Sequence, residues 1–130
     1  VNNRDKASLY FVDIPSAKQS VINIGYIGLP RTDADFYPAE VMNYKLGGSF
    51  SGNVNLILRE EKGYTYGART GFSGSKTPGT FTASSSVRTN TTGESVQIFK
   101  DEIEVLSISF CNILSRSLFP EFLICIGFCR

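Results

Sequence analysis

The stretch that most constrains the fold is residues 19–27, Gln-Ser-Val-Ile-Asn-Ile-Gly-Tyr-Ile. Its β-branched and aromatic side chains are typical of a β-strand, in which successive residues point to opposite faces. Ile22 and Ile24 share one face of such a strand, and Val21 and Ile27 share the other. Because both faces carry apolar side chains, we expect a central strand that is covered on both sides.

Three further segments have the composition of strands. Residues 8–13 are rich in strand formers and stop at a turn that contains a proline. Residues 64–73 and 80–87 are separated by residues 74–79, a short run of glycine, serine, lysine, threonine and proline. A loop of that length and composition between two strands predicts a hairpin.

A first helix is expected between the strand over 19–27 and the pair Gly47-Gly48. Asp33 or Asp35 can cap its start, since a carboxylate accepts hydrogen bonds from free backbone N–H groups. Capping also accounts for these two carboxylates better than a metal site does. Gly47-Gly48 is expected to end the helix in the left-handed conformation. The predicted buried side consists of Val41, Met42, Tyr44 and Leu46.

Two more helices complete the predicted order. A short helix is expected over residues 54–62, and Gly63 stops it. A last helix is expected to open with a capping box over residues 91–94, Thr-Thr-Gly-Glu. Its apolar residues recur at helical spacing and are Val96, Phe99, Ile103 and Leu106. The order ββααββα predicts an α+β domain with one sheet layer and one helix layer.

Composition excludes several classes of function. The 130 residues suffice for one domain, and 42% of them are apolar, which rules out a disordered chain. Thirteen Lys and Arg stand against twelve Asp and Glu, so the chain lacks the positive charge of a nucleic-acid binder. There is no histidine, which excludes a Ser-His-Asp triad and every histidine-ligated metal site in this chain.

The most distinctive residues are Leu46-Gly47-Gly48-Ser49-Phe50 and the run 58–67, Leu-Arg-Glu-Glu-Lys-Gly-Tyr-Thr-Tyr-Gly. With these landmarks the sequence resembles the insulinase-like zinc peptidases, the M16 family, and specifically their non-catalytic, C-terminal-type half. The resemblance covers roughly residues 6–104. It implies the two-layer α+β fold of the LuxS/processing-peptidase-like metallohydrolases, incomplete here at its C-terminal end.

The resemblance also implies a division of labour. In this family one half carries a His-x-x-Glu-His zinc site, whose glutamate activates the metal-bound water, and a homologous half closes over the peptide. The second half supplies an arginine and a tyrosine seven residues apart, and Arg59 and Tyr66 match them in type and spacing. They are expected to contact the carbonyl beside the scissile bond of an extended peptide, which adds to a sheet edge. Zinc is expected in the partner half and no cofactor in this chain.

Other interpretations stay open from the residues alone. The Arg-Glu-Glu-Lys cluster at 59–62 also suits a solvated helix face, and Tyr64 and Tyr66 also suit packing on a strand, Tyr64 more so. Family members include non-catalytic structural subunits, and a truncated remnant is a further alternative. Asn53 stands where relatives often carry an arginine. The resemblance favours a bacterial cell envelope, or periplasm, over a mitochondrion.

The character of the chain changes near Val105. Residues 1–105 are expected to form the partial domain, and residues 106–130 an atypical apolar tail without periodicity, produced by a shifted reading frame. The tail holds all three cysteines, Cys111, Cys125 and Cys129, which are expected to be unreactive. Its longest apolar stretch has 11 residues, whereas a membrane helix needs about 20, so we expect no membrane span.

Overall fold

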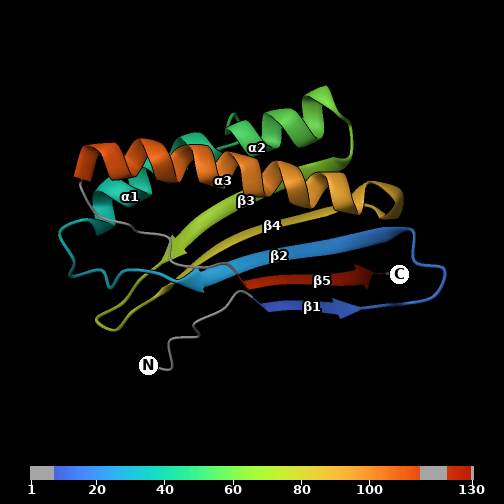
Figure 1. Ribbon diagram of the computed structural model, residues 1–130, viewed down its shortest axis with the longest axis horizontal. Coiled ribbons are helices and arrows are strands. Elements are labelled where there is room, and N and C mark those ends of the chain that lie inside the picture. The colour runs from blue at the N-terminus through green and yellow to red at the C-terminus, as the bar shows by residue number, and fades with distance from the viewer. Residues whose placement is uncertain (1–7, 115–122, 130) are drawn as a thin grey trace.

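The computed structural model describes the backbone of residues 8–114 and 123–129, with the side chains of residues 8–106. A sheet forms one layer and the helices form the other (Figure 1). In chain order the elements are β1 (Ser8–Val12), β2 (Gln19–Ile27), α1 (Phe36–Asn43), η1 (Tyr44–Gly48), α2 (Asn53–Asn55), η2 (Leu56–Glu61), β3 (Thr65–Ser73), β4 (Thr80–Arg88), η3 (Thr89–Thr91), α3 (Thr92–Leu114) and β5 (Leu123–Cys129). The predicted α+β fold and the order ββααββα are confirmed, and β5 is added after them.

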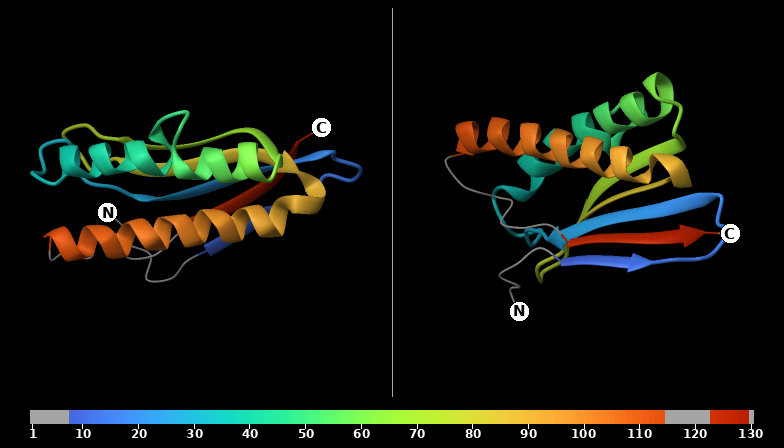
Figure 2. Two further views of the ribbon diagram at one scale, coloured as in Figure 1. Left: turned by 90° about the horizontal axis from the view of Figure 1, so that it is seen from above. Right: turned by 45° about the vertical axis from the view of Figure 1, so that its right-hand side comes forward.

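The sheet has five strands in the order β1-β5-β2-β4-β3. β2 pairs antiparallel with both β4 and β5, and β3 pairs antiparallel with β4, so β2 is central as predicted. The described helices cover one face of this sheet, where α3 runs beside the α1–α2 segment in the opposite direction (Figures 1 and 2). β3 forms one edge of the sheet, next to α1 and α2.

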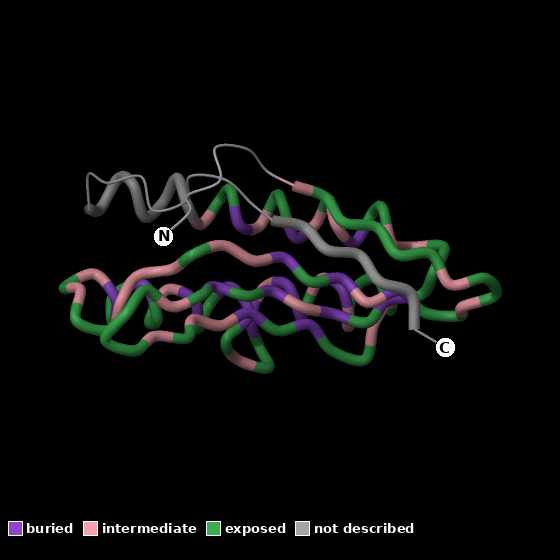
Figure 3. The backbone as a smooth tube through the Cα atoms, turned by 90° about the horizontal axis from the view of Figure 1, so that it is seen from below, coloured by how far each residue is buried: buried purple, intermediate pink, exposed green. Residues whose placement is uncertain are grey.

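The prediction that β2 is covered on both faces is wrong for the described elements. Ile22 and Ile24 are buried under the helices, whereas Ile27 on the opposite face is exposed and Val21 only half-buried. Val21 lies opposite Ser86 on β4, and the exposed residues of β4 on that face are polar. Figure 3 shows this alternation of buried and exposed positions along the strands.

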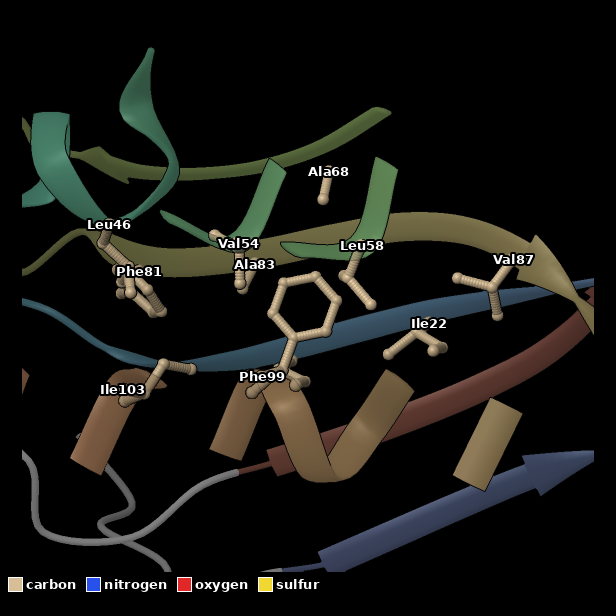
Figure 4. Packing of buried hydrophobic residues seen from close by; sticks show 11 residues of the cluster. Ile22, Leu46, Val54, Leu58, Ala68, Phe81, Ala83, Val87, Phe99 and Ile103 are labelled. Atoms are coloured by element: carbon tan, nitrogen blue, oxygen red, sulfur yellow. The ribbon is translucent and has the colours of Figure 1, made fainter. Parts of the chain in front are cut away.

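The core lies between the sheet and the helices (Figure 4). Phe99 and Ile103 of α3 pack into it, as their helical spacing predicted. Val96 and Leu106 are partly buried against it. Among the described residues, the buried members of this core are Ile22, Ile24, Leu46, Val54, Leu58, Ala68, Phe81, Ala83, Val87, Phe99 and Ile103.

The predicted buried side of α1 is wrong in two of its four residues. Val41 is 74% exposed and Tyr44 is 65% exposed, whereas Leu46 is buried. The residues that face the core are Phe36, Ala39, Asn43 and Leu46. Their spacing of three, four and three is helical. A search for apolar residues at this spacing does not reveal the set, because one member is an asparagine.

The predicted end of this helix at Gly47-Gly48 is confirmed, but the left-handed conformation predicted for these glycines is wrong. The helix continues as π-helix η1 through Gly48, and the glycines with positive φ among the described residues are limited to Gly63. A Cβ on Gly47 would lie 2.6 Å from Cγ2 of Val54 and 2.9 Å from Oγ1 of Thr70. The close approach of α2 and β3, not a left-handed conformation, therefore requires glycine at position 47. Gly63, at φ 63°, ends η2 as predicted.

Both predicted N-terminal caps differ in detail. Asp35 is the N-cap residue of α1 but makes no side-chain capping bond, and Asp33 Oδ1 instead accepts a hydrogen bond from the Asp35 N–H at 2.9 Å. At α3 the capping box does not form. The Glu94 carboxylate accepts hydrogen bonds from Lys62 and Tyr64, since these donors lie on the adjoining turn.

The described residues after Val105 form regular elements, which the sequence did not predict. α3 continues without a break to Leu114. β5 then lies between β1, to which it is parallel, and β2, to which it is antiparallel. The three cysteine side chains lie outside the described ones.

Candidate functional site

Arg59 lies on η2, a π-helical segment directly before the turn at Gly63. The Lys62 N–H donates to the Ile57 carbonyl at 2.9 Å, an i to i+5 bond that widens the last turn. Leu58, next to Arg59, is fully buried in the core. The backbone that carries the arginine is therefore anchored, and the guanidinium projects from a fixed base.

The Arg59 guanidinium lies over the ring of Phe50, with Cζ 4.5 Å from the ring centroid. Its Nη1 is 3.2 Å from Oε1 of Glu60, in a contact without hydrogen-bond alignment. Nη1 is closed to solvent and makes no hydrogen bond. The charge is thus held by a ring on one face and a carboxylate at one end, in a side chain that is 35% exposed.

Tyr66 lies on β3, and its side chain is 91% exposed. Thr65 pairs with Val87 and Ala68 with Ser85, so Tyr66 and Gly67 together lie opposite Ser86 alone. This is a β-bulge, which redirects side chains on a strand. Tyr66 therefore does not pack on the strand, which the sequence had left open. Tyr64, in contrast, is partly buried against the core.

The side chain of Thr65 holds the bulge together. Its hydroxyl donates to the Ser86 carbonyl at 2.7 Å and accepts from the Gly67 N–H at 3.1 Å. The Ser85 hydroxyl in turn donates to it at 2.9 Å. These bonds satisfy polar groups that the bulge removes from the strand ladder, so Tyr66 is presented by a fixed backbone.

Asn55 connects the loop that carries Phe50 with the strand that carries Tyr66. Its Nδ2 donates to the Phe50 carbonyl at 2.6 Å, and its Oδ1 accepts from the Ala68 N–H at 2.9 Å. Asn55 is 2% exposed, the bond to the Ala68 N–H is buried, and the bond to the Phe50 carbonyl is partly buried. Among the described side chains, no hydrogen bond or ion pair joins Arg59 to Tyr66, and the Asn55 amide links the loop and the strand beside them.

A second buried asparagine closes the same strand edge. Asn43 Nδ2 donates to the Thr70 carbonyl at 3.1 Å, and the Thr70 hydroxyl donates back to Asn43 Oδ1. With Asn55 on the Ala68 N–H, two backbone groups of β3 are bound by side chains of the helix layer. The sequence led us to expect strand addition of a peptide at a sheet edge, and at this part of the β3 edge two of the backbone groups that would pair are already bound.

Hydrogen bonds from Lys62 and Tyr64 to Glu94, which we call the Glu94 clasp, join the turn between Arg59 and Tyr66 to the start of α3. Glu94 accepts from Tyr64 Oη at 2.7 Å and from Lys62 Nζ at 3.0 Å. These two hydrogen bonds, with Tyr64 the larger cause, lower the pKa of Glu94, and the bonds to Glu94 raise the pKa of Lys62 and of Tyr64. Arg88 adds a bond from Nη2 to the Gly63 carbonyl at 2.9 Å.

Sequence reasoning missed Phe50 and Asn55. Phe50 follows Gly-Gly-Ser in a loop, where a large aromatic side chain is unusual. Asn55 adjoins Val54 and lies three residues before Leu58, both fully buried, and this position was the available signal for a polar residue in the core. Asn53, which the family resemblance singled out, donates to Glu102 at 3.1 Å.

The part of the chain with described side chains holds no group of three His, Cys, Asp or Glu residues placed to bind a metal ion. In the described part of the chain, no helix has the length and apolar character needed to cross a membrane.

Comparisons with known proteins point to one family. The model of the family described as the peptidase M16 inactive domain matches residues 3–110. No curated protein matches the chain.

Several solved structures share the fold. A peptidase M16 inactive domain from Pseudomonas fluorescens is 27% identical, with a TM-score of 0.71 over 76% of this chain. A protease from Helicobacter pylori is 14% identical, with a TM-score of 0.62 over 85% of this chain, and a conserved protein from Enterococcus faecalis V583 is 18% identical, with a TM-score of 0.61 over 80%. The chain spans 24%, 30% and 24% of the lengths of these three structures, respectively.

Proposed function

Because the chain belongs to the peptidase M16 inactive-domain family, we propose that it is the substrate-binding, zinc-free half of a zinc metalloendopeptidase. Its partner would be a half with the His-x-x-Glu-His motif, on the same polypeptide or on another subunit. That half would hold the zinc, which supplies an activated water for attack on the peptide bond. The absence of histidine means that this chain's own residues do not fit such a zinc site.

In this proposal, Arg59 and Tyr66 donate hydrogen bonds to the peptide carbonyl next to the scissile bond. Arginine stays charged and presents a planar set of donors, and the tyrosine hydroxyl supplies a neutral donor. The observation that carries the proposal is that both lie on fixed supports, an anchored π-helical turn and a braced bulge, and that Tyr66 is 91% exposed. Two donors aimed at the developing oxyanion would each contribute about 3 kcal/mol to transition-state stabilisation.

The substrate in this proposal is an extended peptide. Asn43 and Asn55 occupy backbone groups of Ala68 and Thr70, so the peptide does not add as a sixth strand at that point. We propose instead that it crosses the surface beside Arg59 and Tyr66 and takes its strand pairing, if any, from the partner half. This chain then supplies side-chain donors and the partner half supplies the metal.

The test is reconstitution with the partner. Sequencing the source DNA on both sides of this segment identifies a His-x-x-Glu-His half, which is then produced together with this chain. We expect hydrolysis of an internally quenched fluorescent peptide by the pair and none by either half alone. Full activity of the His-x-x-Glu-His half without this chain would contradict the proposal.

The alternative is a non-catalytic structural subunit, or a remnant, of the same family. One observation favours it: the Arg59 guanidinium already contacts Phe50 and Glu60 within the chain, which is sufficient for a structural side chain. A chain that joins a stable complex with its partner without changing peptide hydrolysis would support the structural subunit. The lack of any His-x-x-Glu-His half in the source would support the remnant.

A further inference from the structure

Phe50 is a large aromatic residue without a place in the core. It lies between η1 and α2 and is 70% exposed. A ring that stays exposed on a loop contributes little to folding, because most of its apolar surface remains in water. The described contact that explains the ring is the Arg59 guanidinium stacked on it, 4.5 Å from Cζ to the centroid, within the range of a cation–π interaction.

The backbone around Phe50 is tied at several points. The Phe50 carbonyl accepts from buried Asn55 at 2.6 Å. The neighbouring Ser49 hydroxyl donates to the Tyr44 carbonyl at 3.0 Å, and the Gly52 N–H donates to the Ser49 carbonyl at 3.0 Å. The backbone that carries the ring is therefore tied on both sides of Phe50, which places the ring beside the guanidinium.

Glu60 competes for the same arginine. It is the adjacent residue on η2, and its Oε1 lies 3.2 Å from Nη1 of Arg59. An ion pair at the surface holds its side chains weakly, so Glu60 alone would not fix the partly exposed Arg59 side chain. A ring on one face of the guanidinium restricts that sampling to orientations parallel to the ring.

We propose that Phe50 is the positioning residue of Arg59, and that Asn55 fixes this pair relative to Tyr66 through its second bond, to the Ala68 N–H. The inference rests on the proposed function for its catalytic consequence, but its structural part stands alone. Phe50 sets the plane and the reach of the arginine donors, and Asn55 sets the register between the loop and the bulged strand.

The first test is an NMR measurement on the full chain. A ring stacked on the guanidinium shifts the Arg59 Hδ and Hε signals upfield through its ring current. Phe50→Leu is expected to remove this shift, and Phe50→Tyr to retain it. Tyr44→Leu is the matched control, because Tyr44 is an exposed aromatic residue on neighbouring η1, and it should leave the Arg59 signals unchanged. Arg59 signals at random-coil positions in the unaltered chain would overturn the proposal.

The second test separates this inference from the proposed function. In the enzyme reconstituted with its His-x-x-Glu-His half, Phe50→Leu is expected to lower kcat about two- to fivefold, the size of an exposed cation–π interaction, with KM nearly unchanged. Phe50→Tyr should restore kcat. If Arg59→Ala lowers kcat and Phe50→Leu does not, the positioning role is wrong. If Arg59→Ala has no effect, the proposed function fails, whereas the ring-current result still decides whether Phe50 holds Arg59.

Discussion

Two asparagines in the core show how single polar residues position this site. Asn43 and Asn55 are nearly inaccessible to solvent, and each bonds the backbone of edge strand β3. A buried polar side chain is tolerated when its hydrogen bonds are made, and its removal leaves the partner groups unsatisfied. Patterns of apolar residues did not by themselves predict these positions, because the patterns count an asparagine as a surface residue.

Asn55→Ala is expected to destabilise the fold by about 2–3 kcal/mol, because it leaves the Ala68 N–H and the Phe50 carbonyl without a hydrogen-bond partner. The measurement is urea unfolding of the full chain. Asn90→Ala is the matched control on an exposed position and should change stability by less than about 0.5 kcal/mol. Equal stability of the two variants would show that the Asn55 bonds contribute nothing.

The clasp at Glu94 predicts a dependence on pH. The folded-state pKa of Glu94 is lowered, chiefly by the bond from Tyr64, so its contribution to stability is present above the unfolded pKa and is lost as pH falls through the folded one. The pKa values of Lys62 and Tyr64 are raised, so their contribution is lost only in alkali, as pH rises through the folded values. Tyr64→Phe should raise the Glu94 pKa in a carboxyl NMR titration. An unmoved titration would refute the clasp.

At the scale of elements, periodicity predicted most of the fold. Strands β2, β3 and β4 and the core positions Phe99 and Ile103 follow from alternation and from helical spacing. The orientation of α1 and the bulge at Tyr66 did not follow, because each depends on contacts with distant segments. Arg59 and Tyr66 were predicted from the family resemblance, whereas the contacts of Phe50 and Asn55 came only from the structure.

The corrected role of Gly47 can be tested directly. Gly47→Ala is expected to cost about 1–3 kcal/mol, because its Cβ would overlap Val54 and Thr70. Gly93→Ala on α3 is the matched control, since nothing lies within 4 Å of its added Cβ. That variant should be neutral or stabilising by up to about 1 kcal/mol. A neutral Gly47→Ala would favour a different packing of η1 against β3.

At the scale of the whole molecule, β5 joins parts of the sheet that are far apart in sequence. It lies between β1 and β2, so β1 has its strand partner only in β5 among the described strands. The sequence did not predict this, because apolar residues without periodicity do not reveal a strand whose partners are distant. The origin of residues 106–130 in a shifted reading frame stays a prediction.

Removal of residues 115–130 should therefore release β1. We expect the amides of β1 to lose protection from hydrogen exchange, while those of the β3–β4 hairpin stay protected, since that hairpin has no contact with β5 in the strand order. Unchanged protection of β1 in the shortened chain would contradict the placement of β5.

The most direct test of the central claim is the turnover of the enzyme reconstituted with its His-x-x-Glu-His half. Arg59→Ala and Tyr66→Phe should each lower kcat about a hundredfold or more, the size of the loss of one oxyanion donor. Arg69→Ala, an exposed arginine on the same strand as Tyr66, should leave kcat unchanged. If all three variants turn over peptide at the rate of the unaltered chain, this half does not supply donors to the reaction.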